Sequence, residues 1–146
     1  MAPSGQSYSN HTQFNPAYHY FTSPISLIYL VWTVKRLIAN PGNDTAYALV
    51  GALAITGLVA VARLSPLRVQ DRMIRLEEQL RYAKLLPADV AAKAESAFSP
   101  RHYIALRFAS DAELPELVNK VLANPAMTQK EIKQAVKNWR GDYFRA

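Results

Sequence analysis

The chain has 146 residues, 50% of them hydrophobic, and its 17 lysines and arginines outnumber its 11 aspartates and glutamates, giving a formal net charge of +6. It contains no cysteine, which excludes disulfides, thiolate nucleophiles, cysteine-based zinc sites and iron–sulfur clusters. Residues 1–34 and 46–62 carry no charged side chain, so an uncharged N-terminal part is joined to a charged C-terminal part.

Residues 1–22 precede the first strongly apolar stretch. They lack the basic start and the small-residue cleavage site of a signal peptide, so we expect them to remain attached. Tyr18, Tyr20 and Phe21 are suited to the headgroup region of a bilayer, which favours an N-terminal interfacial segment.

The first apolar segment predicts a helix over about 24–39. Ser23-Pro24 is a typical helix start, and the segment ends at Asn40-Pro41-Gly42. It is short for a full span, but tilting and the snorkelling side chains of Lys35 and Arg36 offset the deficit.

The second apolar segment predicts a membrane-spanning helix over about 45–64. Asp44-Thr45 supplies its cap, and Pro66 predicts its end. At about 1.5 Å per residue this length matches a hydrocarbon core of about 30 Å. With the turn at 40–43, we expect an antiparallel transmembrane hairpin over residues 23–65.

Basic residues cluster after the second segment, which places that end in the cytoplasm by the positive-inside rule. Two spans then put both termini on the cytoplasmic side of the membrane. Arg63, Arg68 and Arg72 lie beside the membrane in this topology and are predicted to contact anionic lipid headgroups.

The second segment is rich in small residues, including Gly51, Ala54 and Gly57. Small residues allow close helix approach in lipid. They either pack only against the chain's own first helix or form a docking face for another integral membrane protein, and the sequence leaves both interpretations open.

An amphipathic helix is predicted after Pro66 as far as Leu86-Pro87. Its apolar residues follow the 4-3-4-3 spacing of a heptad seam. The seam comprises Val69, Met73, Leu76, Leu80 and Ala83. It needs a partner, which is either the following helices or another subunit.

The remaining chain predicts short helices. They cover residues 88–98 and 99–107, then a helix from a Ser110–Glu113 capping box to Asn124-Pro125, and one from a Thr128–Glu131 box toward Gly141. The last helix is expected to share one apolar face from Ile132 to Trp139. The fold class is therefore all-α, with a basic cytosolic helical domain over 66–146.

Catalytic motifs are absent from the sequence. There is no glycine-rich phosphate loop, no paired-histidine metal motif and no nucleophile elbow. The adjacent Glu77 and Glu78 diverge around a helix and are interpreted as part of a solvated face. Acids interspersed among the bases argue against nucleic acid, so we expect neither enzyme activity, nucleic-acid binding nor a small-molecule substrate.

His19 is the one candidate cofactor ligand. It lies between Tyr18 and Tyr20 at the expected membrane boundary, where a histidine can be an axial ligand to haem or to (bacterio)chlorophyll. A hydrogen-bonded interfacial histidine is the simpler interpretation. No cofactor is expected, apart from this alternative and structural lipids.

Several blocks resemble a family of small bacterial two-pass membrane proteins of unknown function. They are Asn10-His11, Phe14-Asn15-Pro16 and Tyr18-His19, then residues 69–78 (VQDRMIRLEE), 105–111 (ALRFASD), 113–115 (ELP), 132–140 (IKQAVKNWR) and Asp142-Tyr143. The resemblance covers nearly the whole chain. It implies the two-span topology and a bacterial origin, and it implies no catalytic residue.

These features predict a non-catalytic accessory or structural subunit of a larger bacterial membrane complex. An energy-transducing host, in respiratory electron transport or in photosynthesis, is the first expectation, by analogy with peripheral two-helix subunits. The alternatives are a membrane-tethered regulator that binds a cytosolic partner and a pigment- or haem-binding small subunit that uses His19.

Overall fold

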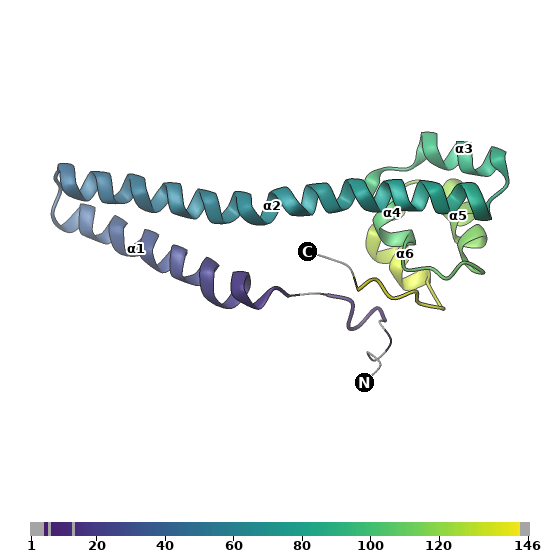
Figure 1. Cartoon of the computed structure of the whole chain (residues 1–146), viewed down its shortest axis with the longest axis horizontal. Helices are drawn as coiled ribbons and strands as arrows, with labels where there is room; N and C mark the ends of the chain where they lie inside the picture. The colour runs from purple at the N-terminus through teal and green to yellow at the C-terminus, as the bar shows by residue number, and fades with distance from the viewer. Residues whose placement is uncertain (1–4, 6, 13, 144–146) are drawn as a thin grey trace. The chain divides into compact units, whose positions relative to one another are not determined.

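The computed structural model describes residues 5, 7–12 and 14–143. Its elements are a π-helix and six α-helices (Figure 1). They are η1 (Ala17–Thr22), α1 (Ser23–Ala39), α2 (Asn43–Leu85), α3 (Ala88–Ala97), α4 (Pro100–Leu106), α5 (Leu114–Ala123) and α6 (Gln129–Ala135). The described residues contain no strand, only one isolated bridge between Ala109 and Trp139, which confirms the all-α prediction.

The described chain divides into two compact units. The helix-pair unit comprises η1, α1 and α2 up to Arg68, and the helical domain comprises residues 69–143 together with the described residues up to Thr12. Helix α2 therefore supplies residues to both units. The N-terminal residues fold with the part of the chain that follows the helix pair.

The helix-pair unit begins earlier than the sequence predicted. The π-helix η1 adjoins α1 directly, so the chain is helical from Ala17 and not from Ser23. The Thr22 hydroxyl donates to the Ala17 carbonyl at 2.9 Å, five residues back, which satisfies one carbonyl of the wide turn. The helical stretch that ends at Ala39 is longer than the apolar run alone indicates.

Helices α1 and α2 run antiparallel side by side (Figure 1). Small and hydroxylated residues lie where the two helices meet. Ala52, Ser26 and Thr33 are buried, and the Thr56 hydroxyl lies 3.5 Å from the Ser26 carbonyl oxygen. The Ser26 and Thr33 hydroxyls each donate to a carbonyl three residues back. The buried hydroxyls of α1 are therefore satisfied within their own helix, as an apolar environment requires.

Helix α2 corrects the prediction at Pro66. The helix does not end there but continues as one element to Leu85, with Pro66 inside it. A proline removes one backbone donor and crowds the preceding turn. Here the helix-forming sequence on both sides outweighs that local cost. Among the described residues, α2 is the helix long and apolar enough to cross a membrane by length and composition. Helix α1 does not reach that length and hydropathy, so the two-span hairpin stays a prediction.

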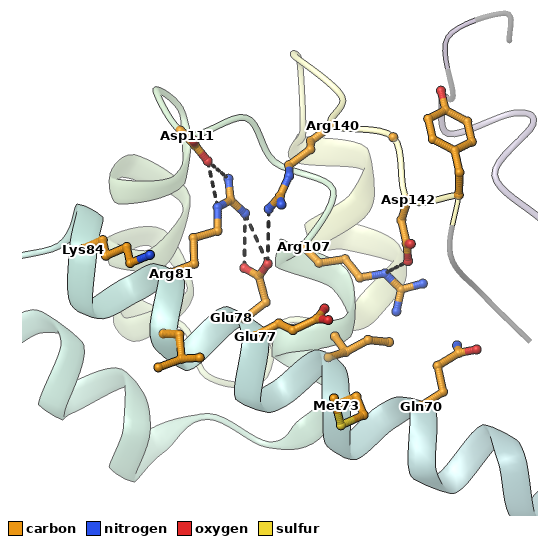
Figure 2. Close-up of a pocket in the computed structure, with 14 residues that line it drawn as sticks. Gln70, Met73, Glu77, Glu78, Arg81, Lys84, Arg107, Asp111, Arg140 and Asp142 are labelled. Atoms are coloured by element: carbon orange, nitrogen blue, oxygen red, sulfur yellow. Dashed lines mark hydrogen bonds and ion pairs between the residues drawn. The ribbon is translucent and has the colours of Figure 1, made fainter.

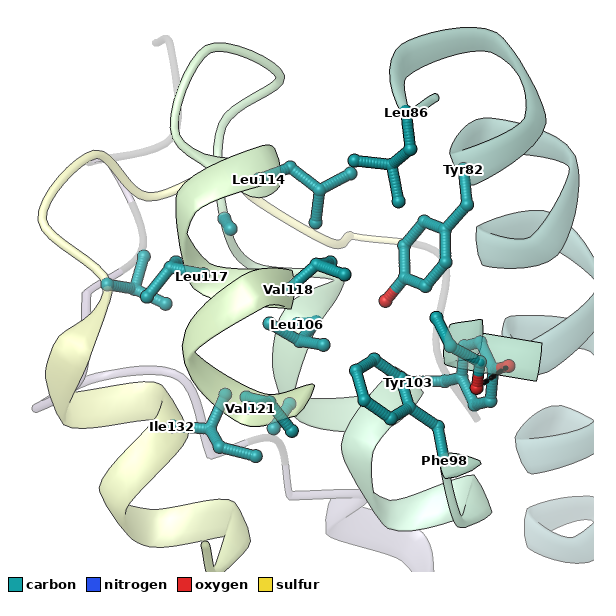
Figure 3. Packing of buried hydrophobic residues seen from close by; sticks show 14 residues of the cluster. Tyr82, Leu86, Phe98, Tyr103, Leu106, Leu114, Leu117, Val118, Val121 and Ile132 are labelled. Carbon is teal, nitrogen blue, oxygen red and sulfur yellow. Dashed lines mark hydrogen bonds between the residues drawn. The ribbon is translucent and has the colours of Figure 1, made fainter. Parts of the chain in front are cut away.

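The helical domain has a core to which all of its helices contribute (Figure 3). Tyr82, in the last turn of α2, and Leu86, directly after that helix, meet α4 and α5 through Tyr103 and Leu114. The Tyr82 and Tyr103 rings stack with their centroids 5.5 Å apart. The last turns of α2 are therefore part of this core.

The caps of the short helices partly follow the sequence. The Thr128–Glu131 box forms at the start of α6, as predicted. The Ser110–Glu113 box does not form, because α5 begins at Leu114 and residues 111–113 make a turn. The Glu113 carboxylate instead accepts hydrogen bonds from the backbone nitrogens of Lys137 and Asn138, at 2.7 and 2.8 Å.

The C-terminal segment also differs from the prediction. Helix α6 ends at Ala135 and does not extend toward Gly141, so Trp139 lies outside it. Residues 138–140 pair with the segment after α4, with the Arg140 nitrogen donating to the Phe108 carbonyl at 2.7 Å. This pairing stacks the Trp139 ring against Phe108, at a centroid distance of 4.9 Å. Packing of the indole against another ring replaces the expected helical face.

Candidate functional site

The part of α2 in the helical domain has two opposite faces. Ile74, Glu78 and Tyr82 are buried against the domain. Val69 precedes Glu78 by nine residues, which at about 100° per residue is two and a half turns, so the two point in opposite directions. The predicted heptad seam is centred on the Val69 side. The sequence left open whether the following helices cover this seam, and they do not.

The seam is exposed along its length. The side chains of Val69, Met73, Leu76 and Leu80 are between 51% and 61% exposed, and Ala83 is exposed as well. These residues form the candidate interaction surface, called the α2 seam below. An apolar row of this spacing on a helix that is already packed on its other face is typical of a surface that another polypeptide covers.

The small residues of the helix-pair unit separate into two groups. Ala52 is buried, on the side that meets α1. A methyl group added at Gly51 or Gly57 would meet no heavy atom of the described residues within 4 Å, and Ala54 is exposed. The residues predicted to bind a partner, Gly51, Ala54 and Gly57, are therefore not used by α1, and they leave an open strip of small residues on α2.

Glu78 is at the centre of an ion cluster on the face of α2 opposite the seam (Figure 2). Its carboxylate, 3% exposed, lies 3.2 Å from Arg81 Nη1 and 3.6 Å from Arg140 Nη1. Burial raises the pKa of this carboxyl, and the two guanidinium groups oppose that shift in part. The sequence-based interpretation of Glu77 and Glu78 as one solvated face is wrong for Glu78, although the two side chains do diverge.

Arg81 connects α2 to the segment after α4. Its guanidinium lies 2.6 Å from an Asp111 carboxylate oxygen and donates to the Ala109 carbonyl at 2.7 Å. Asp111 follows Arg81 by 30 residues, so sequence spacing gave no sign of this pair. The cluster fixes the buried face of α2 to the domain and thereby directs the seam outward.

A cleft of about 630 Å³ lies beside this cluster and has Met73 and Leu80 of the seam at its edge. Its charged lining is balanced, with four basic and four acidic side chains (Figure 2). These are Arg81, Lys84, Arg107 and Arg140 with Glu77, Glu78, Asp111 and Asp142. Arg107 Nε lies 3.0 Å from an Asp142 carboxylate oxygen. Charges that neutralise one another in this way are typical of a structural network.

The predicted lipid-contacting arginines lie in different local settings. The Arg63 guanidinium carbon lies 5.7 Å from the centre of the Tyr18 ring, within the range of a cation–π contact. Arg68 and Arg72 are exposed. All three are compatible with anionic ligands, and none has a carboxylate partner among the ion pairs of the described residues.

His19 has a local hydrogen bond. Its Nδ1 lies 2.9 Å from the Asn15 carbonyl oxygen and 3.1 Å from the Asn15 backbone nitrogen. Phe14 and Tyr18 contact the ring edge-on. This is the hydrogen-bonded histidine of the simpler interpretation, while ligation of a pigment stays a prediction. No group of three acids or histidines that could hold a metal occurs in the described part of the chain.

His11 also has a role that the sequence did not predict. Its ring packs against Phe108 and Trp139, with centroid distances of 5.8 and 5.7 Å, and its Nε2 lies 3.2 Å from Lys133 Nζ. The sequence placed this residue in the N-terminal segment and in one of the family-like blocks, and it predicted no contact for the ring. Its partners follow it by about a hundred residues, and no local pattern pointed to them.

A family model for a family of unknown function matches residues 1–146, which is the whole chain. The chain belongs to this family, DUF6526. No curated protein and no solved structure matches it. Membership in DUF6526 confirms the resemblance to an uncharacterised family. It assigns no residue a role, so the functional argument depends on the surfaces described above.

Proposed function

We propose that this DUF6526 protein is a non-catalytic accessory subunit that is anchored in a membrane and built into a larger membrane complex. The observation that carries the proposal is the exposed α2 seam. The helical domain completes its core through the opposite face of the same helix, so the seam contributes nothing to the fold of the single chain. Burying such a row against a partner is favourable by about 25 cal/mol per Å² of apolar surface.

The apolar part of α2 supports membrane anchoring. Only 11% of its most apolar stretch is buried within the chain, whereas a core helix of a soluble protein is covered on most sides. The open strip at Gly51, Ala54 and Gly57 supports a second contact, with an integral membrane partner, because small residues permit close helix approach in lipid.

The position of the N-terminal segment supports two spans. His11 precedes the helix pair and Trp139 follows it, yet their rings are 5.7 Å apart within one unit. Two residues in contact lie on the same side of a bilayer, so the chain between them crosses it an even number of times. If α2 crosses, α1 crosses too, and the adjoining η1 lengthens α1 for that purpose.

Basic residues support the orientation. Arg63, Arg68 and Arg72 follow the apolar stretch of α2, which favours a cytoplasmic helical domain and two cytoplasmic termini in a bacterial inner membrane. The same side chains are suited to anionic headgroups, each contributing about 1 kcal/mol when it is near the surface. Lipid contact then stabilises the anchor without being the function.

The host is proposed by analogy alone. Small peripheral two-helix subunits fit energy-transducing assemblies, so a respiratory or photosynthetic complex is the first host to test. The balanced charges of the cleft support a structural role over a catalytic one, because six of its eight charged side chains, all but Glu77 and Lys84, form ion pairs with one another.

The test is extraction of the tagged full chain from native membranes in mild detergent, with partner identification by mass spectrometry and an absorption spectrum of the same sample. We expect stoichiometric recovery of integral membrane proteins. Recovery of the chain alone, as a monomer or homodimer, contradicts the proposal. A coloured sample that loses its absorption band in a His19→Ala variant favours the pigment-binding alternative.

A further inference from the structure

We infer that a second copy of this chain covers the α2 seam, in a parallel, in-register pair of α2 helices over residues 69–83. The inference depends on the proposed function, because it names the partner of the same surface. The seam residues, from Val69 to Ala83, have the 4-3-4-3 spacing with which two helices interlock side chains along a common line. Amphipathic helices in general have apolar residues three and four apart, and a row that alternates strictly between the two intervals fits a second helix along its whole length.

The charges beside the seam match those of a second copy. In a parallel pair, the residue just before Met73 or Leu80, which are alternate positions of the seam, lies across from the residue five places later on the partner helix. Arg72, just before Met73, therefore meets Glu77 of the second copy instead of a lipid headgroup, and the two-fold symmetry repeats the pair. Both side chains are exposed, and neither takes part in an ion pair within the described chain.

The next flanking pair is compatible with the same register. Gln79, just before Leu80, meets Lys84 of the second copy, and no like charges are opposed. The seam and its flanking charges are thus complementary to the same residues of a second copy, as an interface between identical surfaces requires. A different protein would need the same heptad spacing with a matching acid and base.

The seam is two heptads long, and isolated helices of that length pair weakly in water. Membrane anchoring offsets this weakness, because two copies in one bilayer share an orientation and a raised effective concentration. The same constraint selects a parallel over an antiparallel pair. This is why the full chain in its membrane is the form to test.

The absence of cysteine makes a single-cysteine test direct. Leu76, at the centre of the seam, faces its own copy in the register described, within the reach of a disulfide. Leu76→Cys in native membranes is expected to form a disulfide-linked dimer about tenfold faster than the control Arg75→Cys. Arg75 is the neighbouring exposed residue on α2 and points away from the seam.

Charge reversal tests the register. In the Leu76→Cys background, Arg72→Glu or Glu77→Arg alone turns two attractive pairs into two repulsive ones. We expect each to lower the rate of dimer formation about fivefold. The double variant R72E/E77R reverses every pair and is expected to restore the rate. A folding defect in either single variant would not be repaired in this way.

Equal cross-linking of Leu76→Cys and Arg75→Cys overturns the inference, as does a double variant no better than the single ones. A photo-reactive residue at position 76 separates the two proposals. An adduct with a different protein overturns the second copy and leaves the accessory-subunit proposal intact. A self-adduct in a preparation without any other protein supports the pair and contradicts the larger complex.

Discussion

Glu77 and Glu78 are adjacent in sequence but differ in environment. Glu77 is exposed at the edge of the cleft, whereas Glu78 is buried between Arg81 and Arg140. Burial raises the pKa of Glu78 despite its two cationic neighbours, so for this group desolvation exceeds the attraction of the ion pairs. We therefore expect the buried charge to orient α2 without adding net stability.

The variant Glu78→Gln tests this balance. At neutral pH we expect its free energy of unfolding to equal or exceed that of the wild type, by up to about 1 kcal/mol, because the amide keeps the shape without the charge. The measurement is urea unfolding of the full chain in detergent, followed by Trp139 fluorescence in a Trp32→Phe background. A loss of several kcal/mol would refute the argument.

The pH dependence of the same variant has a definite sign. As pH rises from 4.5, the ordinary value, to the raised folded-state pKa, the unfolded chain releases the Glu78 proton first, and wild-type stability falls. We therefore expect the free energies of unfolding of the wild type and of Glu78→Gln to converge below pH 4.5 and to separate above it. Arg81→Met is the contrasting variant and is expected to cost about 3–5 kcal/mol, because it leaves Glu78 buried without its nearest counter-charge.

Two stacked tyrosines provide a matched comparison at the same scale. The Tyr82 hydroxyl is buried without a hydrogen-bond partner among the described residues, whereas the Tyr103 hydroxyl donates to the Ala94 carbonyl at 3.3 Å. Tyr82→Phe is expected to be neutral or stabilising, and Tyr103→Phe to destabilise the domain by about 1 kcal/mol. Thermal unfolding measures both variants. The opposite order would contradict the assignment of the two hydroxyls.

At the scale of elements, the two expected capping boxes give a second matched pair. Thr128 caps α6 and accepts from the Glu131 backbone nitrogen, whereas Ser110 caps no helix and its hydroxyl is buried without a partner in the described part of the chain. Thr128→Ala should lower the free energy of unfolding by about 1 kcal/mol, and Ser110→Ala should leave it unchanged or raise it. Equal losses in chemical denaturation would argue that both boxes form.

The helices were largely predictable because their signals are local. Periodicity and caps predicted α1, α3, α4 and the start of α6. Two of the failures, at Glu113 and Trp139, share one cause, which is tertiary contact. Glu113 is drawn to the nitrogens of residues 137 and 138 rather than to a cap, and Trp139 leaves its helix to pack on Phe108. The failure at Pro66 has a different, local cause: the proline stays inside α2 because the sequence on both sides of it is strongly helix-forming.

The candidate site was predictable only in part. The seam is a pattern within one helix, so its five residues could be named from spacing, but its exposure depended on which face the domain covers. The ion cluster that decides this joins Arg81 to Asp111 and Glu78 to Arg140. Partners this far apart in sequence leave no periodic signal. The sequence therefore could not decide whether the chain's own helices or another subunit cover the seam.

At the scale of the whole molecule, the contact between His11 and Trp139 makes a topological prediction. Gly42, in the turn between α1 and α2, should lie across the bilayer from the helical domain. In the cysteine-free chain, Gly42→Cys is expected to react with an impermeant maleimide added to intact spheroplasts. Lys93→Cys, exposed on α3, should react only after permeabilisation. Labelling of both positions in intact spheroplasts would contradict the two-span arrangement.

That same contact has a consequence for the order of events during synthesis. Residues 7–12 leave the ribosome before the helix pair, but Phe108, Lys133 and Trp139, which surround His11, are made about a hundred or more residues later. The helical domain therefore closes on its N-terminal segment only after Trp139 has been made. Until then residues 7–12 are without these contacts. A tag or fusion placed before them is therefore expected to interfere with a late step of folding rather than with an early one.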